Sequence, residues 1–257
     1  MGFIAAAYGV ACYVVFLGSF LYAICFVGNI IVPKTIDSAS GATLPEAIVT
    51  NLVLLGLFAL QHSVMARPGF KAVWTRIVPR SVERSTYVLF ASLLLALICW
   101  KWQAIPTLVW DVSSPALVGL LHALFWLGWV ILLVSTFIIN HFDLFGLRQV
   151  YLRMRGVEYT QVQFVERAFY KHVRHPLYLG FVIAFWSTPQ MSVGHLLFSI
   201  ATTGYILVGI YFEERDLMKF HGAEYGAYRA RVPMLLPTGV KRRRTGAAQT
   251  GQSPMAS

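Results

Sequence analysis

The densest group of residues able to do chemistry is Arg174-His175-Pro176-Leu177-Tyr178-Leu179-Gly180, which stands directly before a long apolar stretch. Glu213 and Glu214 follow that stretch, so charged groups flank both of its ends. Proline is favoured at the first position of a helix, which makes His175 the expected N-cap of a helix that begins at Pro176. The free N–H groups of such a helix start form a natural anion site.

The residue types in this group fit a methyl donor that has a carboxylate, a cationic sulfonium and an adenine. Arg174 and the helix start would hold the carboxylate, and the ring of Tyr178 would face the sulfonium. A glutamate would bind a hydroxyl or an amine; adjacent residues point in different directions, and the position favours Glu214 over Glu213. Gly180 would permit close approach of the ligand. These residue types are therefore compatible with S-adenosylmethionine as the donor.

A second set of polar residues lies at the ends of two earlier apolar stretches. In chain order these are Gln61, His62, His141, Asp143, Arg148 and Gln149. Because the thiolate is the nucleophilic form of a thiol, methyl transfer to sulfur needs a group that favours deprotonation. We expect His62 or His141 to accept the proton, with Asp143 as a possible partner and Arg148 or Gln149 fixing the geometry. Gln61 and Gln149 are expected to contact the substrate.

The elements that must position these residues are membrane-spanning. Hydrophobic residues make up 57% of the 257 positions and charged residues 12%, whereas a soluble domain usually carries about 25% charged residues. A span needs roughly 20 apolar residues. Five stretches lack Asp, Glu, Lys and Arg over such a length or nearly so, and they cover residues 3–32, 47–66, 85–100, 112–142 and 177–212.

The last stretch is too long for one pass. Residues 188–190 and Gly194 interrupt it, and proline breaks helices, so we expect a hairpin of two shorter helices. The expected fold is an all-α polytopic membrane protein with four transmembrane helices and a C-terminal helical hairpin. Its expected parts are a helical region over 1–142, a connection, hairpin and cofactor-binding segment over 143–239, and a basic disordered tail over 240–257. Three cysteines without C-x-x-C spacing predict no metal site.

The basic residues lie in alternate connections. Of the 21 lysines and arginines, only Lys34 and Lys101 fall in the other connections. The positive-inside tendency then places both termini in the cytoplasm. Topology and anionic lipid headgroups account for the net charge of +10, so we expect membrane lipid, no nucleic acid and no obligate protein partner.

Three ordered motifs in the last third resemble one family. They are R-H-P-x-Y-x-G, then E-E-x-x-L, then Gly222-x-x-Tyr225-x-x-Tyr228-x-x-x-Val232-Pro233. Together they resemble the isoprenylcysteine carboxyl methyltransferase superfamily of membrane methyltransferases. The resemblance implies S-adenosylmethionine bound at the cytoplasmic ends of the last helices. Position by position, it implies a cofactor pocket lined by His175, Pro176, Tyr178, Gly180, Glu214, Tyr225 and Tyr228.

The earlier part of the chain resembles a narrower group. Gln61-His62-Ser63-x-Met65-Ala66-Arg67 and the run from Asn140 to Gln149 are similar to the methanethiol S-methyltransferases, which are related to NnrU-type membrane proteins. This resemblance implies conversion of methanethiol to dimethyl sulfide in a bacterial inner membrane. A small volatile thiol would enter through the bilayer, and the charged cofactor from the cytosol.

Two alternatives stay open from the sequence. One keeps the chemistry and changes the acceptor to a prenylated or other lipophilic molecule. The other is an NnrU-like haem-binding or respiratory-accessory protein that uses His62 with His122 or His141 as axial ligands. A transporter is disfavoured because the polar residues cluster on one side instead of at the midplane. No G-x-G-x-x-G occurs between a strand and a helix, which argues against a soluble methyltransferase.

Overall fold

The computed structural model describes residues 2–161 and 166–237. Helices make up most of this part of the chain, together with one pair of short strands. In chain order, the elements are α1 (Gly2–Val27), α2 (Leu44–Ala66), α3 (Pro68–Trp74), α4 (Arg80–Lys101), β1 (Leu108–Asp111), α5 (Pro115–Ile139), α6 (His141–Leu144), α7 (Leu147–Met154), the 3₁₀ helix η1 (Ala168–Lys171), α8 (Pro176–Trp186), β2 (Gln190–Ser192) and α9 (Val193–Arg231).

Five of these helices are long and apolar enough to cross a membrane, namely α1, α2, α4, α5 and α9. Each overlaps one of the apolar stretches of the sequence, so the prediction of an all-α integral membrane protein is confirmed. α8 is also apolar but has 11 residues, which span about 17 Å at 1.5 Å per residue. The expected break at residues 188–190 separates α8 from α9. The expected disordered tail, 240–257, lies outside the described residues.

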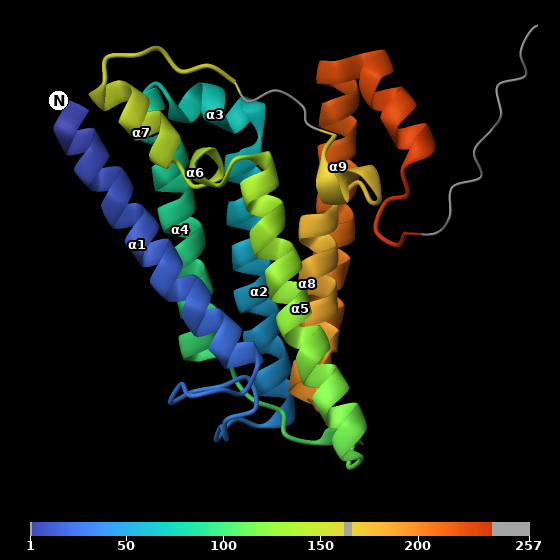
Figure 1. Cartoon of the computed structure of the whole chain (residues 1–257). Coiled ribbons are helices and arrows are strands. Elements are labelled where there is room, and N and C mark those ends of the chain that lie inside the picture. The colour runs from blue at the N-terminus through green and yellow to red at the C-terminus, as the bar shows by residue number, and fades with distance from the viewer. Residues whose placement is uncertain (1, 162–165, 238–257) are drawn as a thin grey trace, which may run out of the picture.

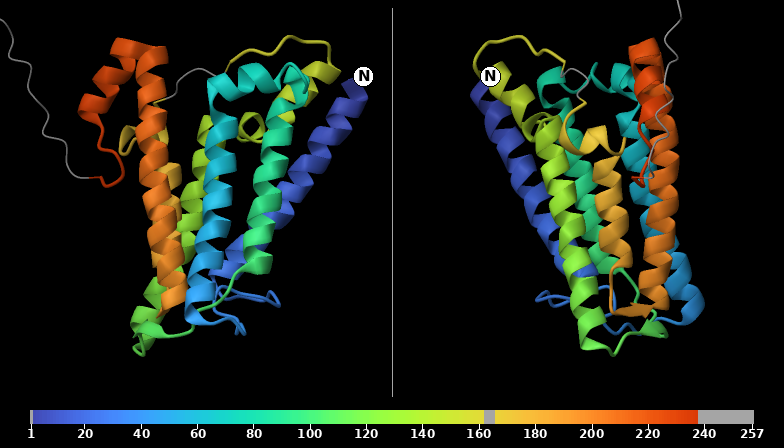
Figure 2. Two further views of the ribbon diagram at one scale, coloured as in Figure 1. Left: turned by 180° about the vertical axis from the view of Figure 1, so that it is seen from behind. Right: turned by 45° about the vertical axis from the view of Figure 1, so that its right-hand side comes forward.

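The second arm of the hairpin is longer than the sequence predicted. α9 has 39 residues and contains a kink at Gly222, whose φ is +48°. Glycine adopts positive φ without the steric cost that other residues meet, which explains the residue type at this point. Beyond the kink the chain turns back, as the red segment in Figures 1 and 2 shows. The prediction of two short helices is right for α8 and wrong for α9.

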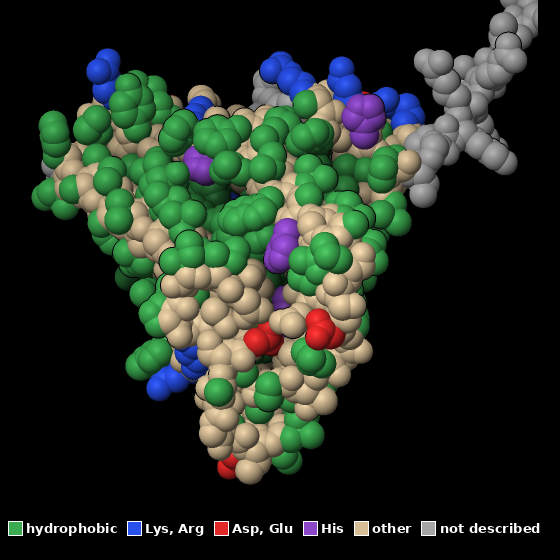
Figure 3. Space-filling view, turned by 60° about the horizontal axis from the view of Figure 1, so that its bottom comes forward, with side chains coloured by type: hydrophobic (Ala, Val, Ile, Leu, Met, Phe, Trp, Pro, Cys, Tyr) green, Lys and Arg blue, Asp and Glu red, His purple; other side chains and the backbone are tan. Residues whose placement is uncertain are grey.

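The two ends of the bundle differ in charge. The start of α1, the helices α3, α6 and α7, and the kink of α9 lie at the upper end in Figure 1, whereas the loop after α1 and the small sheet lie at the lower end. Most blue side chains in Figure 3, which brings the lower end forward, lie at its far edge. The side of the molecule that carries the expected site is therefore the basic side.

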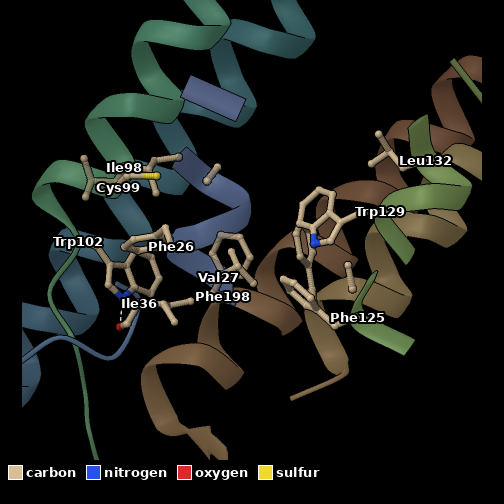
Figure 4. Close-up of a cluster of buried hydrophobic side chains, with 14 residues drawn as sticks. Phe26, Val27, Ile36, Ile98, Cys99, Trp102, Phe125, Trp129, Leu132 and Phe198 are labelled. Carbon is tan, nitrogen blue, oxygen red and sulfur yellow. Dashed lines mark hydrogen bonds between the residues drawn. The ribbon is translucent and has the colours of Figure 1, made fainter. Parts of the chain in front are cut away.

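The core joins the two halves of the bundle. Its buried side chains include Phe26 of α1, Trp102 after α4, Phe125 and Trp129 of α5, and Phe198 of α9, and Figure 4 shows them as one aromatic cluster. The indole N–H of Trp102 donates to the backbone carbonyl of Ile36 at 3.1 Å. This bond satisfies the polar atom of a fully buried ring and fixes the loop after α1.

A small antiparallel sheet closes the lower end, and the sequence did not predict it. Residues of β1 pair with those of β2, with Trp110 opposite Met191. The sheet links the connection before α5 to the turn between α8 and α9. It therefore sets where the hairpin begins relative to α5.

Candidate active site

Glu214 lies at the centre of the motifs that flank the hairpin. Its Oε1 accepts a hydrogen bond from Nε of Arg174 at 2.7 Å and lies 3.1 Å from Nε2 of His175. Its Oε2 lies 3.2 Å from Nε of Arg229. Only 7% of the side chain is exposed. Both carboxylate oxygens are thus bound by side chains of the chain itself.

Arg174 holds the segment after α9 against the start of α8. Its Nη1 donates to the backbone carbonyls of Arg229 and Val232 at 3.1 and 2.6 Å. The amide of Arg174 donates to Pro233 O, and that of His175 to Met234 O. These contacts explain why the first and third motifs need one another. They also use donors of Arg174 that the sequence hypothesis assigned to a ligand carboxylate.

The tyrosines of the third motif lie beyond the kink at Gly222. Tyr228 donates from its hydroxyl to Tyr170 O at 2.7 Å, and its ring lies 5.7 Å from that of Tyr225. Both rings are buried and pack with Val232. The bond from Tyr228 holds the end of α9 against η1.

Glu213 faces a different direction from Glu214. Its Oε2 lies 3.8 Å from Nδ1 of His175, and 45% of its side chain is exposed. The same carboxylate lies near the hydroxyl of Tyr178 and interacts with it electrostatically. The sequence favoured Glu214 over Glu213 as the ligand-facing carboxylate, but Glu213 is the one with an accessible oxygen. The helical offset between adjacent residues was the available signal, and it could not show which of the two turned inward.

His175 and Pro176 occupy the predicted positions at the start of α8. His175 is the N-cap residue and Pro176 follows in the first turn. Gly180 lies one turn further on, against α5. A Cβ on Gly180 would lie 2.6 Å from Gly128 O of α5. The small size of Gly180 thus serves a close helix crossing, whereas the sequence hypothesis gave it to a cofactor.

His62, near the end of α2, bonds to Tyr87 of α4. Nε2 of His62 lies 2.9 Å from the Tyr87 hydroxyl, and that hydroxyl donates to His62 O at 3.4 Å. If the phenol donates its hydrogen to the carbonyl, Nε2 of His62 carries the ring hydrogen and donates it to the phenol oxygen. The lone pair of Nδ1 is then the free acceptor of the ring.

Two buried polar atoms of α2 lack a partner in the described chain, Nδ1 of His62 and Oε1 of Gln61. The ring of Phe58 stacks on that of His62 with centroids 5.2 Å apart. On the α9 side, the hydroxyl of Tyr205 bonds Ser63 at 3.2 Å. Because buried polar atoms are normally satisfied, this pair of atoms is a candidate contact point for a ligand.

The hairpin motif and the His62 group are neighbours. The hydroxyl of Tyr178 interacts electrostatically with those of Tyr87 and Tyr205, as well as with Glu213. Arg67 at the end of α2 bonds Asp216 of α9 at 3.0 Å, which holds these helices together beside the group. The structure therefore brings Glu213, Tyr178, Tyr87 and His62 into one polar cluster.

His141 belongs to a separate arrangement. Its Nε2 lies 2.8 Å from the hydroxyl of Tyr13, and its Nδ1 lies 2.9 Å from Oγ1 of Thr136. Its ring stacks on Phe137 at 4.4 Å between centroids. Burial lowers the pKa of His141 below its ordinary value. Both ring nitrogens therefore have hydroxyl partners, unlike those of His62.

Asp143 and Arg148 pair with each other and not with a histidine. Their ion pair measures 2.9 Å, and Arg148 also donates to the carbonyl and hydroxyl of Thr160 at 2.7 and 2.8 Å. Gln149 donates to Asp143 O at 3.2 Å, and the Tyr159 hydroxyl donates to the Asp143 carboxylate. Burial and that carboxylate raise the pKa of Tyr159. This group fixes the bend between α6 and α7.

Arg84 connects the two histidine arrangements, and the sequence analysis gave it no role. Its guanidinium lies over the ring of Tyr87, 4.9 Å from the centroid. Its Nε donates to Leu144 O of α6 at 2.8 Å. The spacing of Arg84 and Tyr87, three apart on one helix, was the signal that could have found the pair.

Known proteins resemble this chain over most of its length. It is 60% identical over 230 residues to methanethiol S-methyltransferase of Mycobacterium tuberculosis, covering 90% of this chain and 94% of that protein. It is 56% identical over 232 residues to the protein of that name from Crocosphaera subtropica, covering 90% of each. Nurim of Rattus norvegicus is 29% identical over 182 residues, which cover 66% of this chain and 68% of Nurim. No family model and no solved structure matches the chain.

These relatives and the fold define a class, that of polytopic integral membrane methyltransferases. Within that class, the chain belongs to the methanethiol S-methyltransferase family. The resemblance to the methanethiol S-methyltransferases, drawn from the Gln61–Arg67 and Asn140–Gln149 motifs, is thereby confirmed.

Proposed function

We propose that this protein transfers the methyl group of S-adenosylmethionine to methanethiol, a small volatile thiol, and forms dimethyl sulfide. The relatives at 49–60% identity carry the name of that activity. The observation that carries the proposal is the unpartnered Nδ1 of His62, which lies in one polar cluster with the residues of the hairpin motif. The proposed base, His62, and the motif residues proposed to bind the methyl donor thus belong to the same cluster.

The residues of the cluster fit S-adenosylmethionine. Glu213 offers an accessible carboxylate oxygen for an amine or hydroxyl, and the neighbouring ring of Tyr178 offers an aromatic face for a cation. The buried, unpartnered Oε1 of Gln61 is a further acceptor. We propose that Arg174, Glu214, Tyr225 and Tyr228 support this pocket by holding the segment after α9 in place, together with His175 and Pro176.

S-adenosylmethionine, when bound, supplies an electrophilic methyl group on a positively charged sulfur. In the proposed reaction a bond forms between the acceptor sulfur and the methyl carbon while the bond from that carbon to the donor sulfur breaks. The thiol proton passes to Nδ1 of His62. Tyr87 keeps the ring in the tautomer that leaves Nδ1 unprotonated, and Arg84 holds Tyr87. The products are dimethyl sulfide and the demethylated donor.

The membrane setting suits this reaction. Two opposite charges disappear when a thiolate takes a methyl group from a sulfonium, so a water-poor site favours the displacement. We propose that the basic end of the bundle faces the cytoplasm of a bacterial inner membrane, with both termini on that side. The charged donor then enters from the cytosol and the apolar thiol from the bilayer.

The haem alternative has less support. Axial ligation needs two histidine nitrogens free to bind one iron. The two ring nitrogens of His141 bind Tyr13 and Thr136, and His122 is exposed on α5. No observation favours a lipophilic acceptor over methanethiol either.

An assay with three acceptors tests the proposal. Purified protein in detergent receives methyl-labelled S-adenosylmethionine together with methanethiol, hydrogen sulfide or a prenylcysteine analogue. Labelled dimethyl sulfide from methanethiol is the expected product, and His62→Gln serves as the control with intact fold. Transfer to the prenylcysteine analogue alone, or no transfer to any acceptor by protein that binds the donor, contradicts the proposed function.

A further inference from the structure

A groove of about 400 Å³ opens on the outside of the bundle between α1 and α4. Its lining residues are Gly18, Ser19, Tyr22, Lys34, Ala96, Cys99 and Trp100. Four of these residues are small, namely Gly18, Ser19, Ala96 and Cys99. No atom lies within 4 Å of the place where a Cβ on Gly18 would stand. Because α1 and α4 are spanning helices, this groove faces the acyl chains of the bilayer. Its volume lies in the range of about 300–1,000 Å³ that is usual for ligand sites.

Two ammonium groups contact Trp100, which lines one end of the groove. Nζ of Lys34 donates to Trp100 O at 2.6 Å, which leaves two of its three donor hydrogens for another partner. Nζ of Lys101 lies over the ring of Trp100, 4.0 Å from its centroid. Burial and the charge of Lys101 lower the pKa of Lys34. Both ammonium groups thus lie against the same tryptophan, where their like charges repel each other.

No acidic side chain of the described residues forms an ion pair with these two lysines. In residues 2–161 and 166–237, none of the ion pairs includes Lys34 or Lys101. Asp37, three residues from Lys34, binds Asn29 at 2.7 Å and the hydroxyl of Ser192 instead. The cations stand at the lower end of the bundle, where Figure 3 shows few blue side chains. An anion bound at the end of this groove would relieve the repulsion between the two lysines.

We infer that this groove binds one anionic phospholipid, with an acyl chain along Gly18 and Ala96 and the phosphate on Lys34 and Lys101. The charge of the site favours an anionic over a zwitterionic lipid, and the apolar length of the groove favours a lipid over free phosphate. Trp100, whose side chain is 66% exposed, stands at the depth where tryptophans contact headgroups. The site lies at the opposite end of the bundle from His62 and is separate from the methyl-transfer cluster.

Lipid retention measured by native mass spectrometry tests this inference. Purified protein is titrated in detergent with phosphatidylglycerol or with phosphatidylcholine of the same acyl chains. We expect preferential binding of phosphatidylglycerol to the wild type. Lys34→Gln should weaken it about fivefold, the effect of one basic residue beside an anionic lipid surface. Lys219→Gln, which removes one positive charge from the exposed surface of α9, should leave it unchanged.

Gly18→Leu tests whether the shape of the groove matters, apart from the charge of the lysines and the folding of the protein. The variant keeps both lysines and fills open space, so it should fold normally and lose the bound phosphatidylglycerol. Equal binding of the two lipids by the wild type, or unaltered phosphatidylglycerol binding by folded Gly18→Leu protein, overturns the inference. Inorganic phosphate that competes with phosphatidylglycerol at similar concentration overturns it too, because it would show that the groove contributes nothing.

Discussion

The Tyr87 hydroxyl lies 2.9 Å from Nε2 of His62 and also donates to the backbone carbonyl of that histidine. These two contacts with one phenol hold the orientation of the ring. The nitrogen that remains, Nδ1, is buried and has no partner in the described chain. This relationship distinguishes His62 from His141, whose two nitrogens have hydroxyl partners.

His62→Gln should lower kcat for methyl transfer by about 10²-fold or more, the usual contribution of a general base. Donor binding should remain, since the proposed role is to accept a proton. Gas chromatography of dimethyl sulfide and a calorimetric titration with S-adenosylmethionine separate the two effects. His122→Gln, on the exposed face of α5, is the matched control. Undiminished turnover in His62→Gln protein would remove this residue from the mechanism.

Glu213→Gln should weaken donor binding, whereas Glu214→Gln should lower stability. Glu213 has an accessible oxygen, so its neutral variant should fold and bind S-adenosylmethionine more weakly. Glu214 is buried against Arg174, His175 and Arg229; breaking a buried pair leaves an uncompensated charge, and a loss of about 3–5 kcal/mol is usual. Thermal unfolding in detergent and donor titration give the two readouts. Equal donor affinity in wild type and Glu213→Gln would return the ligand-binding role to Glu214.

His141→Gln should act on stability and leave the turnover of folded protein within a fewfold of wild type. The substitution leaves Tyr13 or Thr136 without its partner, which costs about 1–3 kcal/mol for a buried group. Midpoints of thermal unfolding measure the loss, and activity per folded molecule measures turnover. A large fall in turnover at normal stability would restore His141 as the base.

The same histidine predicts a pH dependence. Burial lowers the pKa of His141 in the folded state, so below about pH 6.5, the ordinary value, the unfolded state binds the proton more readily. Its contribution to stability is complete above that pH and is lost as the pH falls toward the lowered pKa. The wild type should therefore lose more of its thermal midpoint between pH 7.5 and pH 5.5 than His141→Gln does. An identical loss in both proteins contradicts this assignment.

The sequence predicted the spans, the hairpin break and the charged side because these depend on composition and period. The motif residues were found for the same reason, as letters at fixed spacing. The sequence could not show which way each side chain points. It placed Glu213 and Glu214 side by side without showing which one Arg174 would bind, and it placed Gly180 in a motif without showing that α5 fills the space in front of it.

Partners from distant segments were also beyond the sequence. Tyr87 is 25 residues from His62, and Leu144 is 60 residues from Arg84. Their pairing depends on how α2, α4 and α6 pack, for which one sequence carries no signal. Asp143 looked like a partner for His141 because the two are near in sequence, yet Arg148 binds it at 2.9 Å. Proximity along the chain was a poor guide to contact at the end of α5.

Gly180→Ala tests whether the motif glycine serves helix packing. Its new Cβ would lie 2.6 Å from Gly128 O, a backbone atom that cannot turn aside, so α5 and α8 must separate. We expect a lower thermal midpoint and weaker donor binding together, because the start of α8 carries His175 and Tyr178. Gly56→Ala in α2 is the control, since nothing lies within 4 Å of its added Cβ and alanine favours helices by about 1 kcal/mol over glycine. If Gly180→Ala keeps the wild-type midpoint and loses only donor affinity, the glycine faces the cofactor as the motif resemblance implied, and the helix crossing is not its reason.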